Sequence, residues 1–298
     1  MASITRQSSS RYYGPSAFGG GGPRRFLELT LTLARTDFKL RYFGSVLGYL
    51  WQLIRPLLFF GVIYLFFTQI LHASKNVPHY GVYLLTGIVL WTFFSEATGT
   101  AVTSLVSREA MLRKVRFPRL AVPIATTLTS LFNFVMNCIA VVVFALINGV
   151  APAWSWLEMI PIIGGFMLLA LGVGMLLSAL FVRFRDIQPI WEVLAQVLFY
   201  ATPIMYPAFN YGHYARYAML NPFAMLNAQM GHAFIHSYAP RVLPRSSGTP
   251  YVGEPFPSAH ALSGSWLVLG ISVALIPAIF ALGLWVFTRE APHVAENL

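Results

Sequence analysis

The chain has 298 residues, of which 57% are hydrophobic and only 10% carry a charge, and its mean hydropathy is +0.65. Soluble domains carry about 25% charged residues, so this composition excludes a water-soluble fold and indicates an integral membrane protein. The net charge of +10 is explained first by a cytoplasmic excess of Lys and Arg rather than by nucleic acid, and the single cysteine excludes an intrachain disulfide.

The N-terminal region divides into a tail and an amphipathic segment. Residues 1–23 are rich in Ser and Gly and lack the apolar core of a signal peptide, so we expect a flexible cytoplasmic tail. In 24–44, "FLELTLTL" alternates like a strand, whereas the spacing of Ala34, Phe38 and Tyr42 favours a helix. Because an isolated strand beside a membrane leaves backbone groups unpaired, we prefer an interfacial helix, with a simple lipid anchor as the alternative role. Its basic side chains would lie near lipid phosphates: Arg35, Lys39 and Arg41.

Six apolar segments follow, each long enough for a bilayer core that takes about 20 helical residues. They cover approximately 46–71, 80–106, 120–147, 158–182, 189–206 and 265–288. Runs of this length do not fit the short alternating strands of a barrel, so the sequence predicts an all-α fold with six transmembrane helices in a domain spanning 45–290. Most of the 20 Lys and Arg residues fall on the side of both termini, which predicts that both termini are cytoplasmic.

Besides Glu158 at the very start of the fourth span, three charged residues lie within the predicted spans. Arg55 in the first span would cost about 2.5–3.5 kcal/mol at a helix centre, so it either lines the substrate entrance, where it could meet a pyrophosphate, or snorkels to the interface. Glu96 and Glu192 could form a proton relay, although isolated carboxylates more often pair with a basic neighbour or cap a helix.

A basic loop, "MLRKVRFPRL", separates the second and third spans. Ser107 is a capping-type residue, and Pro118 disfavours helix at Phe117, so a short amphipathic helix is expected over 107–117. Its mixture of apolar and basic groups is typical of a docking element, and the alternative is a plain topogenic loop that touches anionic headgroups.

The end of the fifth span and the outer region that follows it are rich in tyrosine. Such residues commonly belong to the interfacial aromatic belt, and they can also stack on sugar rings. The candidates are Tyr200, Tyr206, Tyr211, Tyr214 and Tyr217. His232 and His236 lack a third ligand, so no metal site is expected. The proline-rich loop over 237–263 is expected to be irregular and exposed, without an assigned role.

Five stretches in register with these spans carry a family resemblance: "DFKLRYFGSVLGYLWQLIRPLL", "REAMLRKVRFPRL", "VRFRDIQPI", "ATPIMYP" and "LNPFAMLNA". Together they resemble the permease subunits of ABC-2 type transporters that export lipid-linked polysaccharides such as O-antigen, capsule, teichoic acid or galactan. The resemblance implies a bacterial inner-membrane location, a dimer of permeases, and two copies of a separate ABC ATPase.

The resemblance also implies roles for particular segments. The loop 107–117 is similar to a coupling helix that contacts the ATPase through Arg108, Glu109, Met111, Leu112, Arg113, Lys114 and Phe117. The helix 24–44 is similar to a gate at the cytoplasmic entrance, with candidate residues Arg35, Asp37, Lys39, Arg41, Tyr42 and Arg55. Residues 207–236 are similar to short re-entrant helices that form an outer gate, and the five tyrosines in and just before this region would stack on the glycan.

No lysine of the chain follows a glycine, so the sequence contains no Walker A phosphate loop. We therefore expect no cofactor in this chain, and ATP with Mg²⁺ on the partner subunit. An ABC-2 drug or small-lipid exporter is the alternative within transport, and an ion-coupled secondary carrier is the alternative from another class. A membrane-embedded enzyme is not favoured, because neither G-x-S-x-G nor H-E-x-x-H occurs.

Overall fold

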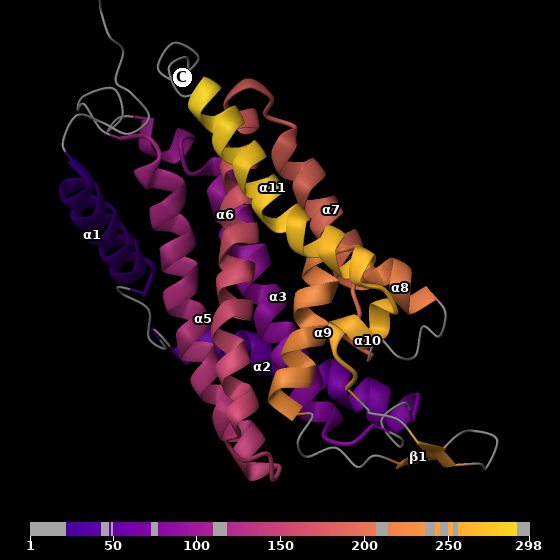
Figure 1. The fold of residues 1–298 in the computed structure, drawn as a ribbon. Coiled ribbons are helices and arrows are strands. Elements are labelled where there is room, and N and C mark those ends of the chain that lie inside the picture. The colour runs from indigo at the N-terminus through magenta and orange to yellow at the C-terminus, as the bar shows by residue number, and fades with distance from the viewer. Residues whose placement is uncertain are drawn as a thin grey trace, which may run out of the picture.

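The computed structural model describes residues 22–42, 48, 50–72, 77–109, 118–206, 214–235, 242–244, 250–252 and 256–290. Within these ranges the chain is almost entirely helical (Figure 1). Helices suit these apolar segments because a helix pairs its own backbone groups where no water is available.

Five helical stretches are long and apolar enough to cross a membrane. They are α2 with the π-helical turn η1 (Leu50–Leu65 and Phe66–Ile70), α3 (Tyr80–Thr103), α5 (Ala121–Ile147), the 3-10 turn η3 with α6 (Trp154–Glu158 and Met159–Arg183), and α11 (Trp266–Glu290). These agree with five of the six predicted spans to within a few residues.

The fifth predicted span, 189–206, is shorter than expected. Its helix α7 covers Ile187–Ala201, which is 15 residues, and Thr202 then adopts an extended conformation with φ −93° and ψ 140°. A helix of this length reaches roughly 22 Å at 1.5 Å per residue, less than a hydrocarbon core of about 30 Å. A sixth complete span therefore stays a prediction.

The chain reverses direction twice beyond α7. The one-turn helix α8 (Ala215–Ala218) leads into α9 (Pro222–Ile235), whose first turn places Phe223 against Phe94 and Phe166, with ring centroids 5.3 and 4.9 Å apart. Its last turn places Phe234 against Trp156 of η3, 4.8 Å away. α9 thus extends from the middle of α3 and α6 to the end of the bundle where η3 lies.

The proline-rich loop is more ordered than predicted. It contains a two-stranded antiparallel ribbon, β1 (Val242–Pro244) and β2 (Pro250–Val252), with Leu243 opposite Tyr251. The short helix α10 (Ala259–Ser263) then precedes α11, and the Ser258 side chain caps it by accepting a bond from the Ala261 amide. The expectation of an irregular loop is therefore wrong for these described parts.

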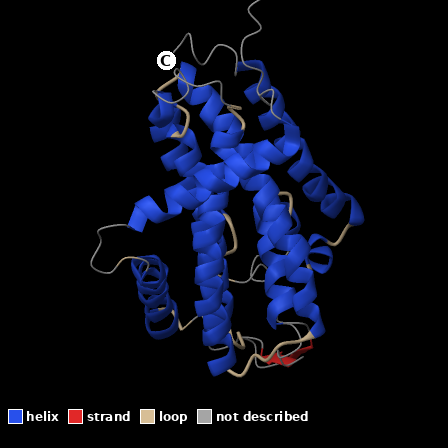
Figure 2. Cartoon of the chain, turned by 90° about the vertical axis from the view of Figure 1, so that its left-hand side faces the viewer, coloured by secondary structure: helices blue, strands red, loops and turns tan. Residues whose placement is uncertain are grey.

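The core of the bundle is built by α3, α5, α6 and α9. Most of α3 is buried, whereas only 17% of the apolar windows of α2 and of α11 is covered within the monomer. The N-terminal helix α1 (Gly22–Tyr42) crosses obliquely in front of the long helices (Figure 2) and packs Phe26, Leu29 and Leu33 against a second apolar cluster around Leu105 and Phe287. The segment that alternates like a strand is therefore helical.

Helices α6 and α11 approach most closely at a pair of glycines. A Cβ added to Gly283 would overlap the carbonyl oxygen of Gly172, and a Cβ added to Gly172 would lie 2.7 Å from Cα of Phe280. Small residues of this kind allow close backbone contact between membrane helices.

Replacing Gly283 with alanine should lower the free energy of unfolding by about 1–3 kcal/mol, because the two backbones must move apart. Thermal unfolding in detergent measures this loss. Gly270→Ala on the same helix is the matched control, since nothing lies within 4 Å of its added Cβ. Equal melting temperatures for the two variants would contradict the close contact.

Candidate functional site

A cavity of about 510 Å³ lies between the C-terminal end of α1, the first half of α2 and the middle of α3. Its lining combines two arginines, one carboxylate, hydroxyl and amide groups and two tryptophans: Arg41, Gly48, Trp51, Gln52, Arg55, Pro56, Trp91, Thr92, Ser95, Glu96 and Thr100. Guanidinium groups bind phosphates, and aromatic rings with neighbouring hydroxyls suit sugars. The cavity therefore has the chemistry for an anionic, glycosylated ligand.

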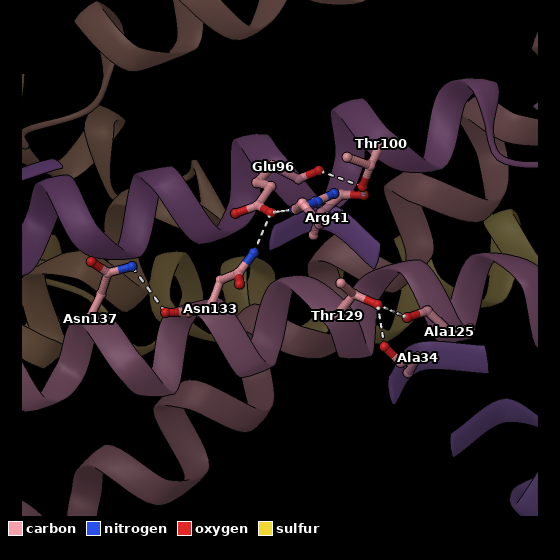
Figure 3. A network of polar contacts seen from close by, with 9 residues as sticks. Ala34, Arg41, Glu96, Thr100, Ala125, Thr129, Asn133 and Asn137 are labelled. Carbon is pink, nitrogen blue, oxygen red and sulfur yellow. Dashed lines mark hydrogen bonds and ion pairs between the residues drawn. The ribbon is translucent and has the colours of Figure 1, made fainter. Parts of the chain in front are cut away.

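Glu96 lies at the centre of the polar network on the cavity wall (Figure 3). Its Oε1 accepts hydrogen bonds from Arg41 of α1 and from the Asn133 side chain of α5, the latter at 2.6 Å. Thr100 donates to the Glu96 backbone carbonyl at 2.7 Å. One carboxylate thereby joins three helices, and the pairing of Glu96 with a basic neighbour is the simpler of the two interpretations given from the sequence.

Arg55 projects from α2 toward the same cavity as Arg41. It is exposed, and within the described part of the chain it forms no ion pair or hydrogen bond. Arg55 and Glu96 both line this cavity. The placement supports a cavity-lining role rather than snorkelling.

The other predicted gate residues are distributed differently. Arg35 and Lys39 are exposed on α1 and do not line the cavity. Asp37 pairs with Arg108, which ends the 3-10 turn η2 (Val106–Arg108) after α3. The side chain of Tyr42 lies outside the described residues. Of the five candidates whose side chains the structure describes, Arg41 and Arg55 are the two that line the cavity.

Helix α1 is held against α5 by specific contacts. The Thr129 hydroxyl donates to the Ala34 carbonyl at 3.3 Å (Figure 3), and Phe38 meets Phe132 edge to face at 5.8 Å. Ala34 is fully buried at this point. These contacts fix the position of α1. From this position Arg41 pairs with Glu96 within α3, and Asp37, one turn earlier, pairs with Arg108 just after α3.

The predicted coupling segment is described only at its edges. Arg108 and Glu109 are partly buried, and Met111, Leu112, Arg113, Lys114 and Phe117 lie outside the described residues. Just beyond them, Arg119 is 3% exposed, and its Nη1 atom finds no hydrogen-bond partner in the described structure. Burial disfavours the charged form of the Arg119 guanidinium and so lowers its pKa.

The outer tyrosines have mixed surroundings. The side chains of Tyr200, Tyr214 and Tyr217 are more than half exposed, Tyr206 is partly buried, and Tyr211 lies outside the described residues. Such exposure suits both the interfacial belt and sugar stacking.

Residues that the sequence analysis did not select hold the outer segment after α7. Tyr80 donates to the Met205 carbonyl at 2.6 Å, Tyr83 donates to the Pro203 carbonyl, and Asn227 of α9 donates to that same carbonyl at 2.9 Å. These bonds satisfy backbone groups where α7 has ended. They fix the position of the segment between α3 and α9.

The polar wall of the cavity was also missed, although a signal for it exists. Thr92, Glu96 and Thr100 recur every four residues in an otherwise apolar helix, which places them on one face. Glu192 instead pairs with Gln188 on its own helix at 3.2 Å. No contact links Glu96 to Glu192 in the described part, so the relay gains no support.

No cluster of three metal-binding side chains is found among the described residues. His232 Nδ1 lies 2.8 Å from the Phe256 carbonyl, a local bond that holds α9 to the chain before α10. His236 lies outside the described residues.

Comparison with known proteins gives a consistent result. The profile of the ABC-2 type transporter family matches residues 28–231, more than half of the chain. The O-antigen export system permease protein RfbA of Klebsiella pneumoniae is 31% identical over 180 residues, covering 60% of this chain and 69% of that protein. RfbA of Myxococcus xanthus is 32% identical over 184 residues, with 61% and 70% covered. The polysialic acid transport protein KpsM of Escherichia coli is 20% identical over 188 residues, with 62% and 73% covered.

The matched region includes most of α1, the cavity, the basic loop and most of α9. This confirms the resemblance inferred from the five sequence stretches. The protein is a multi-pass membrane protein, and its chain belongs to the ABC-2 type transporter family.

Proposed function

We propose that the chain is the membrane channel subunit of an ATP-driven exporter that moves a lipid-linked polysaccharide, O-antigen or a related cell-envelope glycan, from the cytoplasmic to the outer face of the bacterial inner membrane. The observation that carries this proposal is the cavity with Arg41, Arg55 and two tryptophans, in a chain whose relatives are named for O-antigen export and polysialic acid transport.

The proposed orientation follows from the charges. Four arginines lie at one end of the bundle (Figure 1): Arg108 after α3, Arg183 at the end of α6, Arg185 before α7, and Arg289 in the last turn of α11. Basic residues accumulate on the cytoplasmic side of membrane proteins. This end, and with it both termini, is therefore cytoplasmic in the proposal.

In this orientation α1 acts as an interfacial gate. Its oblique course in Figure 2 suits a helix lying at the membrane surface, and its end forms one wall of the cavity. Arg41 and Arg55 would bind the pyrophosphate of the carrier lipid, because paired guanidinium groups match phosphate oxygens. The tryptophan rings Trp51 and Trp91 would contact the first sugar.

The outer end forms a second gate. The short α7, the extended segment after it and the half-length α9 support a chain that dips into the membrane and returns. Tyr200, Tyr206, Tyr211, Tyr214 and Tyr217 would provide stacking surfaces along this route.

The energy for transport is supplied by another polypeptide. The chain lacks a Walker A motif, so the proposal includes two copies of a separate ABC ATPase that bind ATP and Mg²⁺, and two copies of this chain. The contact surface would be the segment 107–117. The poorly covered faces of α2 and α11 are available for a second copy or for lipid.

Co-expression with an ABC ATPase subunit from the same organism tests this function. The two proteins should co-purify, hydrolyse ATP, and move a polyprenyl-pyrophosphate-linked glycan across proteoliposome membranes only when ATP is present. A chain that purifies alone without ATPase activity, or a complex that moves drugs or small lipids but no glycan, would contradict the proposal.

A further inference from the structure

Arg41 is paired with Glu96, although the proposed ligand would bind the same guanidinium group. Among the residues lining the cavity, the charged ones are Arg41, Arg55 and Glu96. Their side chains are accessible from it: that of Arg41 is 33% exposed, and that of Glu96 is 18% exposed. In the structure, therefore, the charge of Arg41 is neutralised by a carboxylate of the protein itself, whereas Arg55 has no such partner among the described residues.

We propose that Glu96 is an internal competitor for the anionic headgroup: its carboxylate holds Arg41, and with it the end of α1, until a phosphate or pyrophosphate takes its place. This inference rests on the proposed function. It assigns Glu96 a positioning role, since the carboxylate acts through Arg41 and does not itself bind the ligand.

The exchange leaves each of the three charged groups with a hydrogen-bonding partner, although Glu96 exchanges a cationic partner for the neutral Asn133 amide alone. A pyrophosphate diester carries two negative charges, which Arg41 and Arg55 together match. Glu96 keeps the Asn133 amide donor at 2.6 Å after Arg41 leaves, so its carboxylate is not stranded without a partner. Stranding a buried charge costs several kcal/mol, and the Asn133 contact reduces that cost.

A second ion pair determines which part of α1 can move. Asp37 lies one turn before Arg41 and is paired with Arg108, while Ala34 accepts from Thr129. Release at Glu96 therefore frees the last turn of α1 and leaves the rest of the helix attached. Arg108 is the second residue of the predicted coupling segment 107–117. The headgroup and the ATPase would therefore act on neighbouring turns of α1, through Arg41 and through Asp37.

Glu96→Gln tests the exchange in the complete complex with its ATPase, reconstituted in nanodiscs. The probes are a polyprenyl pyrophosphate, the uncharged polyprenol and inorganic pyrophosphate. Removing the competing carboxylate should tighten binding of the polyprenyl pyrophosphate about tenfold, within the 5- to 150-fold range of typical coupling between sites. Binding of polyprenol should not change. If inorganic pyrophosphate also binds about tenfold more tightly, the site recognises the phosphates alone. If only polyprenyl pyrophosphate binds more tightly, the site also recognises the lipid tail. Both results support the exchange.

The matched control is Glu192→Gln, which removes a carboxylate outside the cavity lining whose contact in the described part of the chain is with Gln188 of its own helix. The gain from Glu96→Gln should vanish in an Arg41→Gln background, since the effect passes through Arg41. Unchanged or weaker binding in Glu96→Gln, or a gain that persists without Arg41, would overturn the proposal. A wild-type complex that binds no charged probe would instead refute the proposed function.

A measurement without substitution of Glu96 keeps the test independent of folding. Spin labels at Leu40 and Ile147, both well exposed, report the distance between the end of α1 and the end of α5 in a Cys138→Ala background. Polyprenyl pyrophosphate should shift this distance distribution, whereas polyprenol should not. An identical distribution with and without the charged probe would overturn the release of α1.

Discussion

Replacing Arg113, Lys114 and Phe117 together with alanine should abolish stable association with the ATPase subunit. Aromatic and arginine side chains dominate binding at interfaces, and each such residue contributes about 2 kcal/mol or more when it is a hot spot. Loss of one aromatic and two cationic contacts should weaken binding by at least about 100-fold, since each 1.4 kcal/mol is tenfold. Affinity between purified subunits, measured by biolayer interferometry in detergent, gives this number directly.

Arg24→Ala with Arg25→Ala is the control for that experiment. Both residues are exposed on the first turn of α1, and the only described contact of Arg24 is a solvent-exposed pair with Glu28. The control should bind the ATPase like the wild type. If the triple variant also binds normally while remaining folded, the segment 107–117 is a topogenic loop and not the coupling element.

Replacing Arg41 and Arg55 together with glutamine should reduce glycan transport by about 100-fold or more while the complex still assembles. Hydrogen bonds to charged groups contribute about 1.5–3 kcal/mol each, and both cationic partners of the pyrophosphate would be lost. Glutamine keeps a polar side chain of moderate length at each position. ATP-dependent delivery of a labelled lipid-linked glycan in proteoliposomes measures the effect.

Arg35→Gln with Lys39→Gln provides the comparison for the cavity. These residues carry the same charge on the same helix, but they are exposed and outside the cavity lining. Their replacement should cause a much smaller loss. Equal losses for the two double variants would mean that α1 acts through its general charge at the headgroups, and that the cavity is not the binding site.

Much of the fold follows from local sequence patterns, because long apolar runs specify membrane helices without reference to distant residues. The ends of α3, α5 and α11 lie within three residues of their predicted positions. The early end of α7 was not foreseen. Its segment is apolar through Met205, but Tyr80, Tyr83 and Asn227 provide partners that stabilise extended backbone after Ala201.

Individual residues of the site could be predicted from the sequence, but the contacts between them could not. The insertion cost of Arg55 made it a candidate for the substrate entrance, with snorkelling as the alternative, and the basic character of α1 made Arg41 a candidate. The partner of Arg41 is separated from it by 55 positions in the chain, and no periodicity connects residues on different helices. The same holds for the pair between Asp37 and Arg108 and for the contact of Asn133 with Glu96. Contacts of this kind depend on how α1 crosses the bundle, which the sequence pattern does not specify.

Site-specific photocrosslinking tests the central claim most directly. A photoreactive amino acid at Trp51, in the cavity, and another at Trp154, 89% exposed in η3, would be placed in the complex with a non-hydrolysing ATPase. A polyprenyl-pyrophosphate-linked glycan should label position 51 strongly and position 154 weakly. Strong labelling at position 154 with none at position 51 would mean that the anionic carrier does not enter between α1, α2 and α3.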